Sequence, residues 1–202
     1  MRSMLLAVML CGWAGSAAAA PPAADPDWPC VQRLVPELAV ATYWTAAPAP
    51  QGVDWHSDPA VAHIVETVAP RSVLAEQGVA ALKAFAAGLP PNARAAALAE
   101  TFAGLVDEIN HQRDEVIERI KELVRRQRAV GDLVGRISTE LQAVPADATG
   151  ADAARRDEIV QRRALVVRSF EDAQRTIRYA CDVPVALEAR LGAYARALQA
   201  QQ

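Results

Sequence analysis

The sequence predicts an all-α protein, in which a long antiparallel helical hairpin forms a coiled-coil-like stalk on a small helical head, held by one disulfide. Three observations support this fold. Alanine, leucine, arginine and glutamate are abundant in the 202 residues, and these side chains lose little rotamer freedom in a helix. Apolar residues recur at steps of three and four over residues 93–144 and again over 151–180, which is typical of helices that pack against each other. Finally, two cysteines remain after the first twenty residues.

Residues 1–20 have the features of a signal peptide. Arg2 provides a positive start, residues 4–13 are apolar, and residues 16–20 are small, as signal peptidase requires. The apolar stretch is too short for a membrane span, and no later segment is long and apolar enough to make one. We therefore expect an exported protein, periplasmic or secreted, without a membrane span. Residues 21–27 are rich in proline and alanine and are expected to form a flexible leader.

The cysteines predict the disulfide. Cys11 leaves with the signal peptide, and Cys30 and Cys181 enter an oxidising compartment as a pair with one intramolecular connectivity. Two buried free thiols are the alternative. Residues 28–46 are apolar but interrupted by prolines, which favours short helical turns or extended chain pinned at Cys30, and residues 47–53 are expected to form a loop.

Two short helices are predicted next. The first covers residues 59–69, because Asp58 suits the N-cap and Pro59 fits the first helical position, where its missing N–H costs nothing. The second covers residues 73–87, with Ser72 as its cap and a glycine just after its last turn.

A very long helix, residues 93–144, follows a predicted cap at Asn92. Its expected hydrophobic seam, the row of mostly apolar residues along its packed face, is Ala95, Leu98, Phe102, Leu105, Ile109, Gln112, Val116, Ile120, Leu123, Gln127, Val130, Val134, Ile137, Leu141 and Val144. The next helix, residues 151–180, has a seam of Ile159, Arg163, Val166, Phe170, Ala173, Ile177 and Ala180. Pro184 is expected to end that helix and to begin a separate last helix over residues 185–200.

Helix lengths predict the shape. At about 1.5 Å per residue the long helix reaches roughly 75 Å and its return partner only about 45 Å, so other elements must cover the first third of the long helix. We therefore expect a head made of residues 28–112 and 181–202 and a stalk made of residues 113–180, with the disulfide between them. The alternative is one squat bundle, with the long helix broken near Gly104 or Gly131.

Charge and motifs exclude several classes of function. The net charge is −3, whereas a nucleic-acid-binding protein needs a basic excess. Residues 25–112 and 181–202 hold 12 acidic and 6 basic residues, and residues 113–180 hold 12 acidic and 14 basic residues, as expected for a solvated coiled coil laced with salt bridges. The sequence has no phosphate-binding glycine loop, no G-x-S-x-G and no C-x-x-C, so we expect no enzyme activity and no cofactor.

Possible metal ligands are few. Asp54, His56, Asp58 and His63 lie close together in the sequence and could surround a zinc or copper ion. Asp58 is better explained as a helix cap, however, and nothing requires the two histidines to converge. We therefore predict no metal site.

The tryptophans are the most unusual feature. Trp28, Trp44 and Trp55 all fall within residues 28–55, where they could fill the head core or serve as binding hot spots. Trp55 and His56 are the pair most expected to be exposed, and Trp44, Trp55 and His56 are the candidate partner-binding residues. Polar seam residues such as Gln112 and Gln127 usually fix helix register, although they could also mark a place where the stalk grips a partner.

The leading functional hypothesis is a non-enzymatic interaction protein of the bacterial cell envelope, located in the periplasm, which acts as an accessory subunit, an adaptor or a chaperone-like protein. The alternative is a helical bundle that binds a small ligand or cofactor near Trp44, Trp55, His56 and His111. The seams are compatible with a single hairpin, a dimer of hairpins, or capture of a partner helix. The outline is similar in general shape to periplasmic chaperones with helical tentacles, but no motif is shared.

Overall fold

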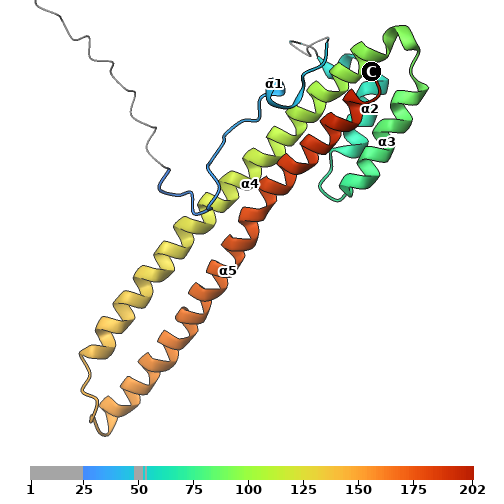
Figure 1. The fold of residues 1–202 in the computed structure, drawn as a ribbon. Helices are drawn as coiled ribbons and strands as arrows, with labels where there is room; N and C mark the ends of the chain where they lie inside the picture. The colour runs from blue at the N-terminus through green and yellow to red at the C-terminus, as the bar shows by residue number, and fades with distance from the viewer. Residues whose placement is uncertain (1–24, 48–51, 53) are drawn as a thin grey trace, which may run out of the picture.

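A computed structural model describes residues 25–47, 52 and 54–202; the predicted signal peptide lies outside the described residues. The fold is all-α, and its order is α1 (Val40–Tyr43), a 3₁₀ turn η1 (Trp55–Ser57), α2 (Pro59–Val68), α3 (Ala75–Gly88), α4 (Pro91–Gln142) and α5 (Ala151–Gln199). Figure 1 shows α4 and α5 as a long antiparallel hairpin, with α2 and α3 packed at the end where the chain terminates. The predicted all-α fold, with a long antiparallel hairpin and a small helical head, is therefore confirmed.

The long helix is continuous. α4 has 52 residues, which at the standard helical rise gives about 78 Å, so neither Gly104 nor Gly131 breaks it. Its start differs from the prediction, because Pro90 is the N-cap, Pro91 occupies the first turn and no side chain caps the helix. Pro91 supplies the backbone angle that the first turn needs, and Asn92 is already inside the helix.

α5 corrects the predicted break near Pro184. The helix runs unbroken from Ala151 to Gln199, with Pro184 buried inside it. An internal proline removes one backbone hydrogen bond and crowds the preceding turn. In that turn the carbonyl of Cys181 accepts a hydrogen bond from the Gln32 side chain at 2.5 Å. Ile177 before the proline and Leu187 after it are both buried, so α5 is packed on both sides of Pro184.

The two short helices are also close to their predicted bounds. α2 begins as expected, with the Asp58 carboxylate accepting from the backbone N–H groups of Ala60 and Val61. The predicted Ser72 cap of α3 is wrong, because α3 begins at Ala75, two residues later than expected, with Leu74 as its N-cap. The turn before it is held instead by Arg190 of α5, whose guanidinium donates to the carbonyls of Ala69, Pro70, Arg71 and Val73.

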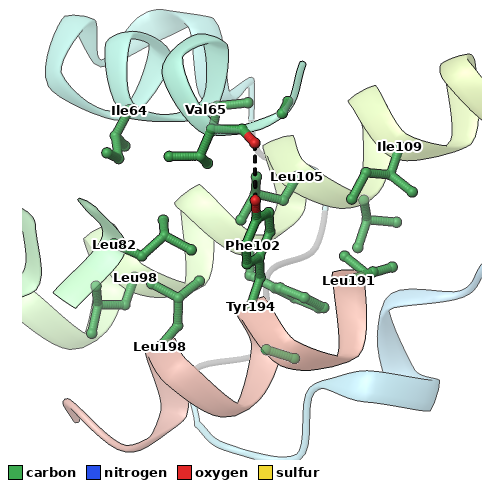
Figure 2. Packing of buried hydrophobic residues seen from close by; sticks show 14 of the residues in the cluster. Ile64, Val65, Leu82, Leu98, Phe102, Leu105, Ile109, Leu191, Tyr194 and Leu198 are labelled. Carbon is green, nitrogen blue, oxygen red and sulfur yellow. Dashed lines mark hydrogen bonds between the residues drawn. The ribbon is translucent and has the colours of Figure 1, made fainter. Parts of the chain in front are cut away.

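The main hydrophobic core lies in the head, where α2, α3, the first half of α4 and the end of α5 meet. Figure 2 shows Tyr194 at its centre, pointing from α5 toward α2. The Tyr194 hydroxyl donates to the carbonyl of Val68 at 3.0 Å, and burial raises the pKa of this phenol. Aliphatic side chains from all four helices surround it, among them Leu82, Leu98, Leu105, Ile109, Leu191 and Leu198.

One glycine of the head core permits close packing. A Cβ atom on Gly104 would lie 2.8 Å from the Trp55 ring and 2.9 Å from Val65. Gly104→Ala should therefore lower the free energy of unfolding by about 1–3 kcal/mol through overpacking, measured by chemical denaturation. Gly135→Ala is the matched control, because a Cβ there meets nothing within 4 Å, and it should raise stability by about 0.5–1 kcal/mol. Equal effects of the two substitutions would contradict the close packing.

The N-terminal segment is fastened to the long helices at several points. Cys30 and Cys181 form the predicted disulfide, with their Cα atoms 5.5 Å apart. The backbone of Leu38 exchanges two hydrogen bonds with the Asn110 side chain of α4, at 2.9 and 3.0 Å. In Figure 1 this segment follows α4, up to α1 beside the head.

Candidate functional site

The predicted partner-binding tryptophans belong to the core. Trp44 is 5% exposed and stacks on Phe102 of α4, with ring centroids 5.0 Å apart. Trp55 is 7% exposed, lies against Gly104, and donates from its ring nitrogen to Asp107 at 3.2 Å. The expectation that Trp55 is exposed is therefore wrong, because α4 provides both the glycine that accommodates its ring and the carboxylate that bonds its N–H.

His56 is exposed, as predicted, and its ring packs on the indole of Trp55. Its ring stacks on the indole at 3.6 Å between centroids, and its Nδ1 lies 3.1 Å from an Asp54 carboxylate oxygen. Asp58 is occupied as the cap of α2. Within the part of the chain that the structure describes, no three histidine, cysteine, aspartate or glutamate side chains gather in a way that could hold a metal ion.

The polar residues of the predicted seams make hydrogen bonds both in the head and across the hairpin. Gln112 is buried and donates to the carbonyl of Ala69 at 3.1 Å and to Glu108 at 2.9 Å, so it ties α4 to the end of α2. Gln127 is half-buried, whereas Arg163 is exposed and donates from Nε to the Ser138 hydroxyl across the hairpin at 3.0 Å.

The stalk packs well at both ends and poorly between them. Ile120 is buried, as the seam predicted, but Ile117 and Val124 are buried near the head in place of the predicted Val116 and Leu123, which are half-buried. At the tip, Ile137, Val144 and Ile159 form a second small core. Between these two regions lies what we call the open stalk segment, residues 125–136 of α4 and 160–176 of α5, in which no residue is buried.

A shallow groove marks the tip end of the open stalk segment. Its volume is about 260 Å³, and it is lined by Leu133, Arg136, Ile137, Glu140, Arg162 and Val166. Glu140 and Arg162 form an ion pair across the hairpin beside it. Leu133 is 36% exposed, and Leu165, which neighbours Val166 in sequence, is 60% exposed. The stalk thus presents leucine side chains to solvent beside charges of both signs.

A larger groove lies at the neck, where the stalk meets the head. It has a volume of about 710 Å³. Part of its wall is made of half-buried or buried apolar side chains from both long helices, namely Val116, Ile120, Ala180 and Val183. Charged side chains of both signs, including Arg71 from the turn after α2, form the rest of the wall. The mixture suits a polypeptide better than a small apolar ligand, because pockets for such ligands are lined mostly by apolar side chains.

Two buried arginines were missed by sequence reasoning. Arg113 is 2% exposed and donates to the carbonyl of Val35 at 2.9 Å and to Glu188 at 2.8 Å, which joins the N-terminal segment to α4 and α5. Arg190, described above, is 9% exposed. A signal for it exists in the sequence, since Arg190 stands three residues after Leu187 and four before Tyr194, on the apolar face of its helix.

The predicted leader ends in a segment that contacts α4. Asp25 pairs with Lys121 at 3.1 Å, and Asp27 pairs with Arg125 at 3.1 Å and with Arg128 at 2.5 Å. The pKa of the Asp25 carboxyl is lowered by the backbone N–H of Asp27 and then by Lys121. Hydrogen bonds from Arg125 and Arg128 lower the pKa of Asp27. Both carboxylates are thus stabilised in their charged form on this face of α4.

None of the helices described is both long and apolar enough to cross a bilayer. The chain matches no protein-family model, no curated protein and no solved structure.

Proposed function

We propose that this chain is a non-enzymatic protein-interaction module of the cell envelope, acting as an accessory subunit, adaptor or chaperone-like protein, and that it holds a protein partner along its stalk. The observation that carries the proposal is the open stalk segment, where two long helices lie together without burying a single residue. The Cys30–Cys181 disulfide supports an oxidising compartment, and residues 1–20 suit export.

The physical argument rests on what two helices can bury. A helix pair covers only one side of each apolar seam, and helical bundles complete their cores by adding further helices. Leu133 remains exposed in the groove beside Arg136, Glu140 and Arg162. Leu165, three residues after Arg162 on α5, is also exposed. This pattern suits an amphipathic helix of a partner, with leucine-sized side chains in its centre and charges of both signs at its edges.

The alternative of a ligand-binding bundle gains no support from the residues chosen for it. Trp44 and Trp55 fill the head core on either side of α4 residues 102–104. His111 is exposed and lies 3.5 Å from Glu115 on the surface of α4. These side chains therefore do not line a common cavity.

The test is capture of the tagged mature protein from its native envelope, with protein identification by mass spectrometry. A Leu133→Glu, Leu165→Glu variant should lose most of any stoichiometric partner, because each substitution places a charge in a desolvated contact, at a cost of about 2 kcal/mol or more. Leu74→Glu is the matched control on the head, since Leu74 is 63% exposed.

The two variants distinguish a partner that binds the stalk from one that binds the head. Retention of the partner by Leu74→Glu and its loss from the stalk variant would support a stalk-bound partner. The reverse pattern would move the site to the head, and an unchanged partner with both variants would contradict the role of the exposed leucines. Circular dichroism checks that each variant keeps its helical content.

A further inference from the structure

We infer that Lys121, Arg125 and Arg128 of α4 form a binding site for a short acidic protein segment, and that Asp25–Asp27 fills this site as the chain's own occupant. We call these three cations the basic triad. The inference deepens the proposed function, on which it rests for the presence of a protein partner, by naming the chemistry of one segment that a partner would offer.

The triad is a site because its members share one face of the helix. The spacing of four and then three residues places Lys121, Arg125 and Arg128 in a row along α4. The other exposed arginines of this region, Arg119 and Arg126, belong to a different face, where both pair with Glu122.

The occupant shows which chemistry the site accepts. Two carboxylates spaced by one residue reach all three cations, and Arg128 also donates to the backbone carbonyl of Pro26. Recognition of a main-chain carbonyl together with side-chain carboxylates is peptide recognition. Glu118 pairs with Lys121 at 3.0 Å, so a long polyanion that continued along α4 beyond Lys121 would meet a carboxylate, whereas a short acidic segment would not.

The occupant is held in a way that permits exchange. Arg125 and Arg128 are each 51% exposed, and ion pairs at such exposure contribute little to stability. The segment stays in place because Cys30, three residues after Asp27, is bonded to α5, which keeps the two carboxylates at a high local concentration. An acidic segment of a partner that is anchored elsewhere on the stalk gains the same advantage and can replace it.

The probe is a fluorescein-labelled peptide with the sequence of residues 25–29, titrated at low salt with the full mature chain and followed by fluorescence anisotropy. The Asp25→Asn, Asp27→Asn variant should bind the peptide at least about tenfold more tightly than the unmodified chain, because it lacks a tethered competitor at millimolar effective concentration. Adding Arg125→Gln and Arg128→Gln should abolish that binding. Adding Arg119→Gln and Arg126→Gln instead removes the same charge from the other face. The affinity for the peptide should then stay within twofold of the asparagine variant's, as local recognition requires.

Equal binding by the unmodified chain and the asparagine variant would overturn the inference, as would equal losses from the two arginine pairs. All substituted side chains are at least partly exposed, so the fold is expected to survive. The Leu133 and Leu165 capture experiment does not involve the triad. Failure of the peptide titration would therefore leave the stalk proposal standing, and failure of partner capture would not produce a negative titration.

Discussion

Replacing Phe102 by alanine is expected to lower the free energy of unfolding by about 3–5 kcal/mol. Phe102 is fully buried at the centre of the head core and stacks on Trp44. The substitution removes a large apolar side chain from a place where α2, α4 and α5 cannot easily collapse, and it also deprives the indole of its partner. Denaturant-induced unfolding, followed by circular dichroism, measures the change.

Phe170→Ala provides the matched comparison. Phe170 lies in the open stalk segment and is half-buried, so the same substitution should cost roughly 1–2 kcal/mol. A loss at Phe170 as large as the loss at Phe102 would mean that the stalk carries as much of the stability as the head, and would contradict the location of the main core.

Removal of the disulfide is the second large expected effect. The bond joins residues separated by 151 positions, and loss of a native disulfide that closes so long a loop typically costs about 2–5 kcal/mol. The Cys30→Ser, Cys181→Ser variant should unfold at a correspondingly lower denaturant concentration than the oxidised protein. The double substitution avoids a free thiol that could form bonds between molecules.

Reduction supplies the control for this prediction. The unmodified protein in excess dithiothreitol should match the double-serine variant, and the variant itself should not respond to the reductant. If the oxidised protein and the variant unfolded at the same denaturant concentration, the disulfide would contribute nothing to stability. Thiol labelling of the unreduced mature protein should find no free cysteine.

The large features of the fold were predictable because they follow from local periodicity. Steps of three and four over residues 93–144 specify a helix whatever it packs against, and Asp58 caps α2 through hydrogen bonds within three residues. The disulfide was predictable from counting alone. These signals need no knowledge of distant contacts.

The errors arose where distant contacts override local rules. Pro184 would end an isolated helix, but α5 is supported from both sides and receives a hydrogen bond from Gln32, more than 140 positions earlier. Ser72 would cap an isolated helix, but Arg190 holds its turn in another conformation.

The candidate site was predicted less well for the same reason. Tryptophan is favoured in binding hot spots. Nothing near Trp55 in the sequence shows that Gly104 makes room for its ring and that Asp107 accepts its N–H. Likewise, the acidic character of residues 25–27 is visible in the sequence, whereas the alignment of three cations on α4 matters only once the disulfide has placed that segment beside them.

The position of the disulfide also determines what a protease could achieve. The turn between α4 and α5, residues 143–150, is largely exposed at the far tip of the molecule, where cleavage is most readily tolerated. Because Cys30 precedes that turn and Cys181 follows it, a single cut there would leave two pieces, each with one long helix, still joined covalently near the head. Such a nicked protein would migrate as one species until it is reduced, and its two arms would be free to separate from the tip while the head stays assembled.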